Sequence, residues 1–397
     1  MGKKILLYSS TFLWVKSDKG LLYNTNNFNA QEFGINKSIK TICNSLLDYD
    51  NLYRVSINKT NVDIDDFIEL IEQGGFGEVL DNDSENVISL PPLLNLQFSI
   101  DRIERNPGLD IGENALTYLH TLSIYTGGSA NNKDYYRQIT YPVTSTEILD
   151  VNAIVKFIER SSSPYIQTIN IIISNIENYD IINLCTKLSY LKDSLVLYIT
   201  LPITGNQKKL ASHILSRGFR ITFICDFESP ISVLLAFKPY LHYSSGVHFN
   251  LIVRSIQEYE DRTNLMEKHN IENYSVIPLY DNNIEFFNKN IFLTSEEILG
   301  SQLSKRKIFA HQVINTLSFG HLIVMPDGLI YSNVNSKHIG KIEDFNTDII
   351  VKELKENHSW RRIRDSKICK ECLYEWLCPS PSDYEIVMKK DCICSNK

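Results

Sequence analysis

Residues 369–397, CKECLYEWLCPSPSDYEIVMKKDCICSNK, carry five of the eight cysteines in this 397-residue chain. The five are Cys369, Cys372, Cys378, Cys392 and Cys394. Two thiolates separated by two residues can turn back onto one metal ion or one iron–sulfur cube, and groups from later in the chain then complete a four-ligand site. The spacing therefore predicts one bound metal or cluster. A disulfide knot or a set of free thiols is the alternative.

Composition and charge place the chain among ordinary globular proteins, with 43% apolar and 22% charged residues, and its length allows two or three domains. A formal charge of −7 argues against a nucleic-acid binder. No apolar run approaches the ~20 residues of a membrane span, and the amino end lacks the apolar core of a signal peptide. We therefore expect a cytoplasmic protein, in which the terminal cysteines hold metal and the isolated cysteines are buried thiols. The isolated cysteines are Cys43, Cys185 and Cys225.

Residues 1–86 are expected to form a small α/β domain. Strands are predicted at 11–15 and 21–23, and a helix begins after Asn36, an N-cap residue. Another strand follows at 52–57, and a second amphipathic helix covers 63–73. This order of elements resembles the winged-helix modules that recognise leader peptides in enzymes that modify ribosomally made peptides. A generic α/β cap on the next domain is the alternative.

Residues 87–300 alternate apolar runs with amphipathic helical stretches. Such a pattern is typical of parallel strands covered by helices. An incomplete parallel βα barrel is predicted, and a doubly wound open sheet is the alternative. The predicted strands are 116–125, 168–173, 195–201, 220–225 and 249–253, and the predicted helices are 148–159, 180–192 and 207–217.

Residues 301–397 are expected to form a third, cysteine-rich domain. Two short strands flank the turn at Pro326, Asp327 and Gly328, and glycine suits the positive φ of such a turn. A helix is predicted at 348–357. Because so small a unit has little core of its own, a bound metal would stabilise it.

Four terminal segments carry a resemblance to a known family: IFAHQVINTLSFG (308–320), PDGLIYSNVN (326–335), SWRRIR (359–364) and CKECLYEWLCPSPSDYE (369–385). With a partial barrel before them, they resemble radical S-adenosylmethionine peptide maturases that carry a SPASM domain. The chain is most similar to the pseudo-radical-SAM proteins, which accompany genuine maturases in gene clusters for ribosomally synthesised, modified peptides (RiPPs). The resemblance implies a degenerate barrel and a SPASM-like terminal domain.

The departures from that family decide the expected activity. Its catalytic 4Fe–4S cube is held by a CxxxCxxC loop after the first barrel strand, and the matching stretch here, 125–141, has no cysteine. Serine and asparagine cannot replace soft thiolate ligands. The resemblance therefore predicts no catalytic cluster, no cleavage of S-adenosylmethionine and no binding of it.

One auxiliary site of the family is retained and the other is lost. Asn333 and Ser382 stand where the first auxiliary cluster would take cysteines. The second site matches Cys369, Cys372 and Cys378, with Cys392 or Cys394 as the last ligand. The expected cofactor is one 4Fe–4S cluster or zinc. The expected neutralising cations are Arg361, Arg362 and Arg364.

Three functions compete. The first is a non-catalytic accessory protein that binds a precursor peptide, a catalytic radical-SAM maturase or both, with an interface formed by Tyr135, Tyr136, Arg137 and Tyr141. The second is an electron-relay iron–sulfur protein for such a maturase. The third is a barrel enzyme that uses the carboxylates of Asp226 and Glu228. Residues near these carboxylates in sequence are His242, Tyr243 and His248. Alternative metal ligands are His311, His321 and His338.

Overall fold

Apolar strands from the middle of the chain build one large sheet. The computed structural model describes residues 3–59, 61–81, 89–93, 112–128, 134–177, 179–203, 205–226, 235, 237 and 246–394. Within these residues the main sheet has nine strands in the order β14-β13-β12-β11-β10-β7-β15-β16-β17. Its first six strands in sequence are β7 (Thr121–Tyr125), β10 (Thr168–Ile173), β11 (Leu195–Leu201), β12 (Arg220–Cys225), β13 (Val247–Val253) and β14 (Tyr274–Pro278).

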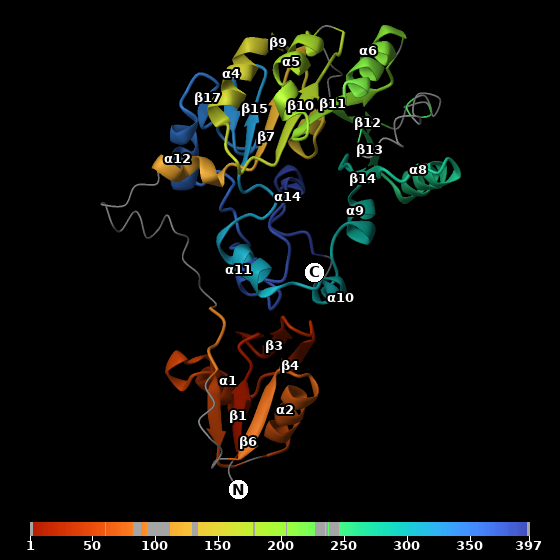
Figure 1. Cartoon of the computed structure of the whole chain (residues 1–397). Coiled ribbons are helices and arrows are strands. Elements are labelled where there is room, and N and C mark those ends of the chain that lie inside the picture. The colour runs from red at the N-terminus through yellow and green to blue at the C-terminus, as the bar shows by residue number, and fades with distance from the viewer. Residues whose placement is uncertain are drawn as a thin grey trace.

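These six strands are parallel, and each lies beside the one before it in sequence. Because crossovers are right-handed and the strand order never reverses, the connecting helices all cover one face. Figure 1 shows α4, α5 and α6 on that side of the sheet. This single winding is the arrangement expected of an incomplete barrel and excludes the doubly wound alternative. The connecting helices are α4 (Val151–Ser161), α5 (Ile181–Lys187), α6 (Gly205–Ser216) and α8 (Ile256–Lys268).

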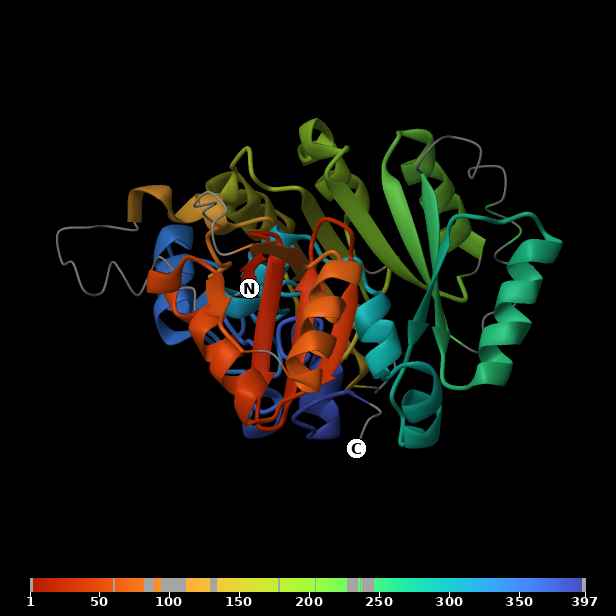
Figure 2. The ribbon, with the colours of Figure 1, turned by 90° about the horizontal axis from the view of Figure 1, so that it is seen from below.

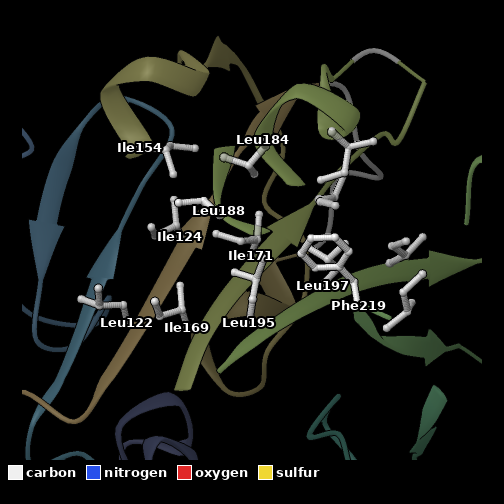
Figure 3. Close-up of a cluster of buried hydrophobic side chains, with 14 of the residues drawn as sticks. Leu122, Ile124, Ile154, Ile169, Ile171, Leu184, Leu188, Leu195, Leu197 and Phe219 are labelled. Atoms are coloured by element: carbon white, nitrogen blue, oxygen red, sulfur yellow. The ribbon is translucent and has the colours of Figure 1, made fainter. Parts of the chain in front are cut away.

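Alternation along the strands separates a core from an opposite, more polar face. Leu122, Ile171 and Leu197 point toward the helices and pack in one buried cluster with Ile154 and Leu184 (Figure 3). The residues between them point the other way, because successive strand side chains alternate. We call that second side the inner face. Its side chains include Ser123, Asn170, Tyr198, Thr222, Asn250 and His321.

Several element boundaries differ from those predicted. The first barrel strand begins at Thr121 rather than 116, because Gly112–Tyr118 forms a 3-10 helix. The helix predicted from 148 begins at Val151, since Asp150 caps it by accepting from two backbone N–H groups. Residues 145–148 instead form β9 (Ser145–Ile148), which pairs with β8 (Gly127–Gly128).

The N-terminal unit contains two three-stranded sheets. One has the order β2-β3-β4 and the other β5-β1-β6. As predicted, Asn36 caps a helix, and its side chain accepts from the Ile39 N–H at 3.0 Å. The strands β1 and β6 were not predicted, and they complete the second sheet. The elements are β1 (Lys3–Leu7), β2 (Thr11–Lys16), β3 (Lys19–Asn24), β4 (Ala30–Gly34), α1 (Lys37–Leu47), β5 (Arg54–Ile57), α2 (Val62–Gln73) and β6 (Gly77–Asp81).

The terminal region joins the main sheet. β15 (His321–Val324) pairs in parallel with β7, and the turn between β15 and β16 (Leu329–Tyr331) has Gly328 at φ +77°, as the sequence predicted. The third predicted domain therefore contributes strands to the second. Its remaining elements are β17 (Gly340–Lys341), α11 (Lys305–Val313), α12 (Asn346–Glu356), α13 (Lys367–Lys370) and α14 (Asp383–Met388), preceded by α9 (Ile284–Asn290) and α10 (Ser295–Gly300).

The N-terminal unit packs against the terminal region through a joint core. Phe12, Trp14 and Tyr23 are buried against Ile308 and Leu377. Figures 1 and 2 both show the unit beside the terminal elements and away from α8. Among the helices that the structure describes, none has the length and apolar character to cross a membrane.

Candidate metal centre

The five terminal cysteines line one cavity of about 180 Å³. Cys369 lies on α13, whose N-cap Ser366 accepts from the Cys369 N–H at 3.3 Å. Cys372 follows in a turn closed by its N–H on the Cys369 carbonyl at 2.9 Å. A second turn, from the Cys378 N–H to the Tyr374 carbonyl at 2.9 Å, brings the third thiol to the same cavity. The CxxC-x5-C spacing thus places three thiols on a common wall, and a metal or cluster bound by them stays a prediction.

The last two cysteines reach the cavity through a contact with a distant segment, which the sequence around them does not predict. Leu293, between α9 and α10, donates its N–H to the Ile393 carbonyl at 3.3 Å and forms a parallel bridge with Cys394. The Sγ atoms of Cys392 and Cys394 lie 3.4 Å apart. Both side chains line the cavity. Either can therefore act as the last ligand.

One of the three expected arginines lies at the cavity. Arg364 lines it, donates to the Pro379 carbonyl at 2.7 Å and pairs with Glu385 at 2.5 Å, with about 5% of its side chain exposed. Arg362 instead donates to the Pro381 and Ser382 carbonyls. A buried guanidinium beside thiolates offsets their negative charge.

Burial keeps two of the metal-free thiols, Cys372 and Cys378, protonated. It raises the pKa of Cys378 to about 12, against the lowering effect of Arg364, and it also raises the pKa of Cys372. Metal binding at these thiols would therefore release protons.

The thiols surround a volume and do not meet at a point. Within the described ranges, no group of three or more His, Cys, Asp or Glu side chains is arranged to hold a single ion directly. Five soft sulfur donors around an enclosed, mostly apolar cavity fit an iron–sulfur cluster. A tetrahedral zinc site would need the sulfurs to approach within ~2.3 Å of one centre.

At the edge of the barrel, the stretch that would hold a catalytic cluster is built from tyrosines. Residues 129–133 of this stretch lie outside the described residues. In the rest, Tyr141 is buried and packs edge-on against Tyr135, with ring centroids 5.2 Å apart. The Gln138 side chain pairs twice with the Tyr280 backbone, at 2.8 and 2.9 Å. Of the predicted interface residues, Tyr141 is buried, Tyr135 and Tyr136 are half-buried and Arg137 is exposed, and the interface itself stays a prediction.

The proposed carboxylate site is not assembled among the described residues. Asp226 pairs with Arg254 at 2.7 Å, so its charge is already neutralised. His248 on β13 pairs with Thr222 on β12, and Thr222 stands four residues before Asp226. The histidine is therefore displaced along the strands from the carboxylate at the carboxyl end of β12. Its ring nitrogens contact Asn273 and Ser275. Glu228, His242 and Tyr243 lie outside the described residues.

The remaining candidate cysteines and histidines do not line the cysteine cavity. Cys43, Cys185 and Cys225 are buried, as expected, and burial raises the pKa of each thiol to about 12. His311 is buried with Nδ1 at 2.9 Å from the Trp376 carbonyl oxygen, and His338 is exposed.

His321 lies inside the main sheet on the inner face. Its Nε2 is 2.8 Å from Ser123 Oγ. Burial lowers its pKa to about 4.

No family model matches the chain, and no curated protein matches it. Among solved structures, the chain is similar to Streptococcus suis SuiB bound to the precursor peptide SuiA, with 12% identity, a TM-score of 0.46 and 99% of each chain covered. SuiB bound to S-adenosylmethionine shows 11% identity and a TM-score of 0.43, with 100% of this chain and 99% of that chain covered.

Proposed function

We propose that this chain is a non-catalytic, pseudo-radical-SAM accessory protein of RiPP maturation, which binds a precursor peptide and a catalytic radical-SAM maturase. The observation that carries the proposal is the distribution of cysteines. Five terminal cysteines line one cavity, whereas the barrel edge from Tyr125 to Tyr141 has none in its sequence. A chain with that distribution keeps an auxiliary site and lacks the ligands for radical chemistry.

For the auxiliary site we favour one 4Fe–4S cluster over zinc. A cavity of 180 Å³ is roughly ten times the ~15 Å³ that a single water needs. A cluster fills such a space, while a single ion leaves most of it empty. When bound, the cluster would tie α13 to residues 392–394. It would also stabilise a region whose own core is small.

The N-terminal unit supplies a groove suited to the peptide. β4 is an edge strand, and two adjoining hollows that share Asp66 and Leu70 run between it and α2. An extended peptide can pair with such an edge and place alternate side chains in the hollows. The acidic side chains along the groove favour a basic segment. They are Asp18, Asp63, Asp66 and Glu69.

Anaerobic purification tests the cofactor and the absence of catalysis together. We expect about four irons and four sulfides per chain, broad absorbance near 400 nm, ~10-fold less zinc than iron, and no 5′-deoxyadenosine after reduction with S-adenosylmethionine. Formation of 5′-deoxyadenosine above the no-protein background would overturn the non-catalytic proposal. One zinc per chain without iron would replace the cluster and leave the accessory role standing.

Size-exclusion chromatography tests the partnership. The proposed role requires a radical-SAM maturase and a precursor peptide from the same gene cluster, and the probe is that maturase, mixed with the purified chain with and without that peptide. A shared peak is expected. Separate peaks in both mixtures, with full peptide maturation in a strain that lacks this protein, would refute the accessory role.

An electron relay is the second candidate, favoured by the exposure of the cysteines. Cys372, Cys378, Cys392 and Cys394 are all partly exposed, so a cluster held there would lie near the surface. A relay requires that the reduced chain transfer electrons to the maturase. Stopped-flow mixing that shows no oxidation of the reduced cluster by the maturase would exclude it.

A further inference from the structure

A second cavity lies on the inner face of the main sheet. Its volume is about 340 Å³, near the lower end of the range for small-molecule sites, ~300–1,000 Å³. Ser123 and Tyr125 from β7 form part of the floor, and the anchored segment with Tyr136 covers it. Helix α14 adds Asp383 and Tyr384. Elements more than 200 residues apart in the sequence therefore contribute to one enclosure.

The lining combines aromatic and aliphatic side chains with one carboxylate. Tyr125, Tyr136 and Tyr384 contribute three rings, and Asp383 is the acid. No lysine or arginine belongs to the lining among the described residues, although the Arg137 guanidinium lies over the Tyr136 ring, 5.6 Å from its centroid. Aromatic faces attract cations through their quadrupole, and a carboxylate adds a direct charge. The enclosure thus has the chemistry of a cation site.

Among the described residues, Asp383 has only a long ion pair with a protein cation, the guanidinium of Arg362. Asn333 Nδ2 donates to Asp383 Oδ1 at 2.5 Å, and Arg362 Nη2 stays 3.8 Å from the same oxygen. That nitrogen of Arg362 already donates to two backbone carbonyls at 2.9 Å each. The Asp383 side chain is 38% exposed. Desolvation still raises its pKa, as expected for a group that faces a confined space.

The one titratable imidazole of the cavity does not repel a cation. His321 is neutral at pH 7, because burial lowers its pKa to about 4. Its Nε2 is satisfied by Ser123 Oγ, which also accepts from Asn170 at 3.2 Å. The floor of the cavity is therefore uncharged, with Ser123, Asn250 and His321 beside isoleucines of the same strands, and Asp383 supplies the charge.

We infer that this cavity binds an organic cation, and that in the accessory role proposed above the cation is a lysine or arginine side chain of the peptide. The peptide as the source of the cation rests on the proposed function, whereas the binding of an organic cation does not. Tyrosine rings would enclose the alkyl chain and the charged group, and Asp383 would pair with the charge. A neutral side chain of the same length would lose both attractions.

Ligand-detected NMR titration tests the first clause with four probes: n-butylammonium, n-butylguanidinium, 1-butanol and butyrate. The two cations should bind at least tenfold more tightly than the alcohol, and butyrate should not bind. Asp383→Asn and Tyr136→Leu should each weaken butylammonium binding at least fivefold. The matched control is Asp348→Asn, the same change at an exposed carboxylate on α12. If Asp383→Asn fails to fold, Tyr136→Leu and the probe series remain decisive.

Equal binding of butylammonium and butanol, or unchanged binding in both cavity variants, would overturn the cation site. The peptide clause has its own arm, in which the neighbouring precursor peptide is compared with copies that carry norleucine for each lysine and citrulline for each arginine. Tighter binding of the cationic peptide, lost in Asp383→Asn, supports it. Butylammonium binding without any peptide difference would disprove the peptide source and leave the cation site. Tighter binding of S-adenosylmethionine than of both alkyl cations would also refute the peptide source.

Discussion

Single side chains set the charge balance at both cavities. At the cysteine cavity, Arg364 lies beside the thiols and is already paired with Glu385, and burial holds Cys378 protonated until a metal displaces the proton. On the inner face, burial keeps His321 neutral while Asp383 carries the charge. The two cavities are therefore suited to different cations, a soft metal in one and an organic cation in the other.

Cys372→Ser is expected to abolish the bound cluster or metal, because a hydroxyl cannot replace a soft thiolate. The loss should also destabilise the terminal region, since a metal that organises its own site contributes folding free energy, ~10 kcal/mol for structural zinc. Iron, sulfide and zinc per chain are measured after anaerobic purification. Cys43→Ala, a buried thiol of the N-terminal unit, is the control and should keep full content. Unchanged content in Cys372→Ser would contradict the site.

His321 should make the fold sensitive to acid. The pKa of its imidazole is about 4 when folded, against about 6.5 when unfolded, so the unfolded chain binds the extra proton first as pH falls below 6.5. Because His321 is half-buried, this residue should therefore cost at most about 3 kcal/mol of unfolding free energy between pH 6.5 and pH 4. Urea unfolding of His321→Gln should show a smaller loss over that window. His338→Gln, at an exposed site, should follow the parent protein, and identical pH profiles for parent and His321→Gln would refute the assignment.

At the scale of elements, the buried parallel strands of the main sheet could be predicted from the sequence, whereas several strand pairings could not. Runs such as Ile169 to Ile173 announce a buried parallel strand, because both faces need apolar residues. β1 was missed because Lys3 and Lys4 precede only three apolar residues. The cavity formed by the five cysteines followed from their spacing. The bridge from Leu293 to Cys394 did not, since it joins segments about 100 residues apart.

The segment of residues 134–141 is held in place by side-chain contacts rather than by the backbone hydrogen bonds of a strand pair. Gln138→Ala would remove two hydrogen bonds to the Tyr280 backbone. Each is worth ~1 kcal/mol, so the loss of both should accelerate hydrogen exchange at the Tyr280 amide about 30-fold. Gln257→Ala, which removes only an exposed contact with Asp261, is the control. Unchanged exchange at Tyr280 would show that other contacts hold the segment.

At the scale of the whole molecule, the N-terminal unit is connected directly to the cysteine cavity. Tyr374, which lines that cavity, donates its hydroxyl to Glu32 on β4. Lys16 on β2 pairs with Glu375 at 3.0 Å and donates to the Lys370 carbonyl at 2.6 Å. The proposed peptide-binding edge and the proposed metal site are therefore joined by a continuous set of contacts.

Substitutions at two neighbouring residues of β2 can distinguish a specific connection to the cysteine cavity from general destabilisation of the N-terminal unit. Phe12 faces the joint core with the terminal region, whereas Leu13 faces the core of the N-terminal unit. Each change to alanine should cost ~3–5 kcal/mol locally. Phe12→Ala should speed alkylation of Cys378 by iodoacetamide in the metal-free protein, measured by mass spectrometry, and Leu13→Ala should not. Equal alkylation rates in both variants would exclude a specific connection.

The pairing of β15 with β7 also bears on how the protein is made. His321 lies opposite Thr121, two hundred positions later in the chain, so a ribosome adding ~5–20 residues per second leaves that edge of β7 open for ~10–40 s. During this interval a row of backbone groups on an apolar strand has no native neighbour. An exposed strand edge of this kind is a template for aggregation. We therefore expect nascent chains of this protein to be prone to aggregation until the terminal region emerges, and slower translation to lengthen that exposure.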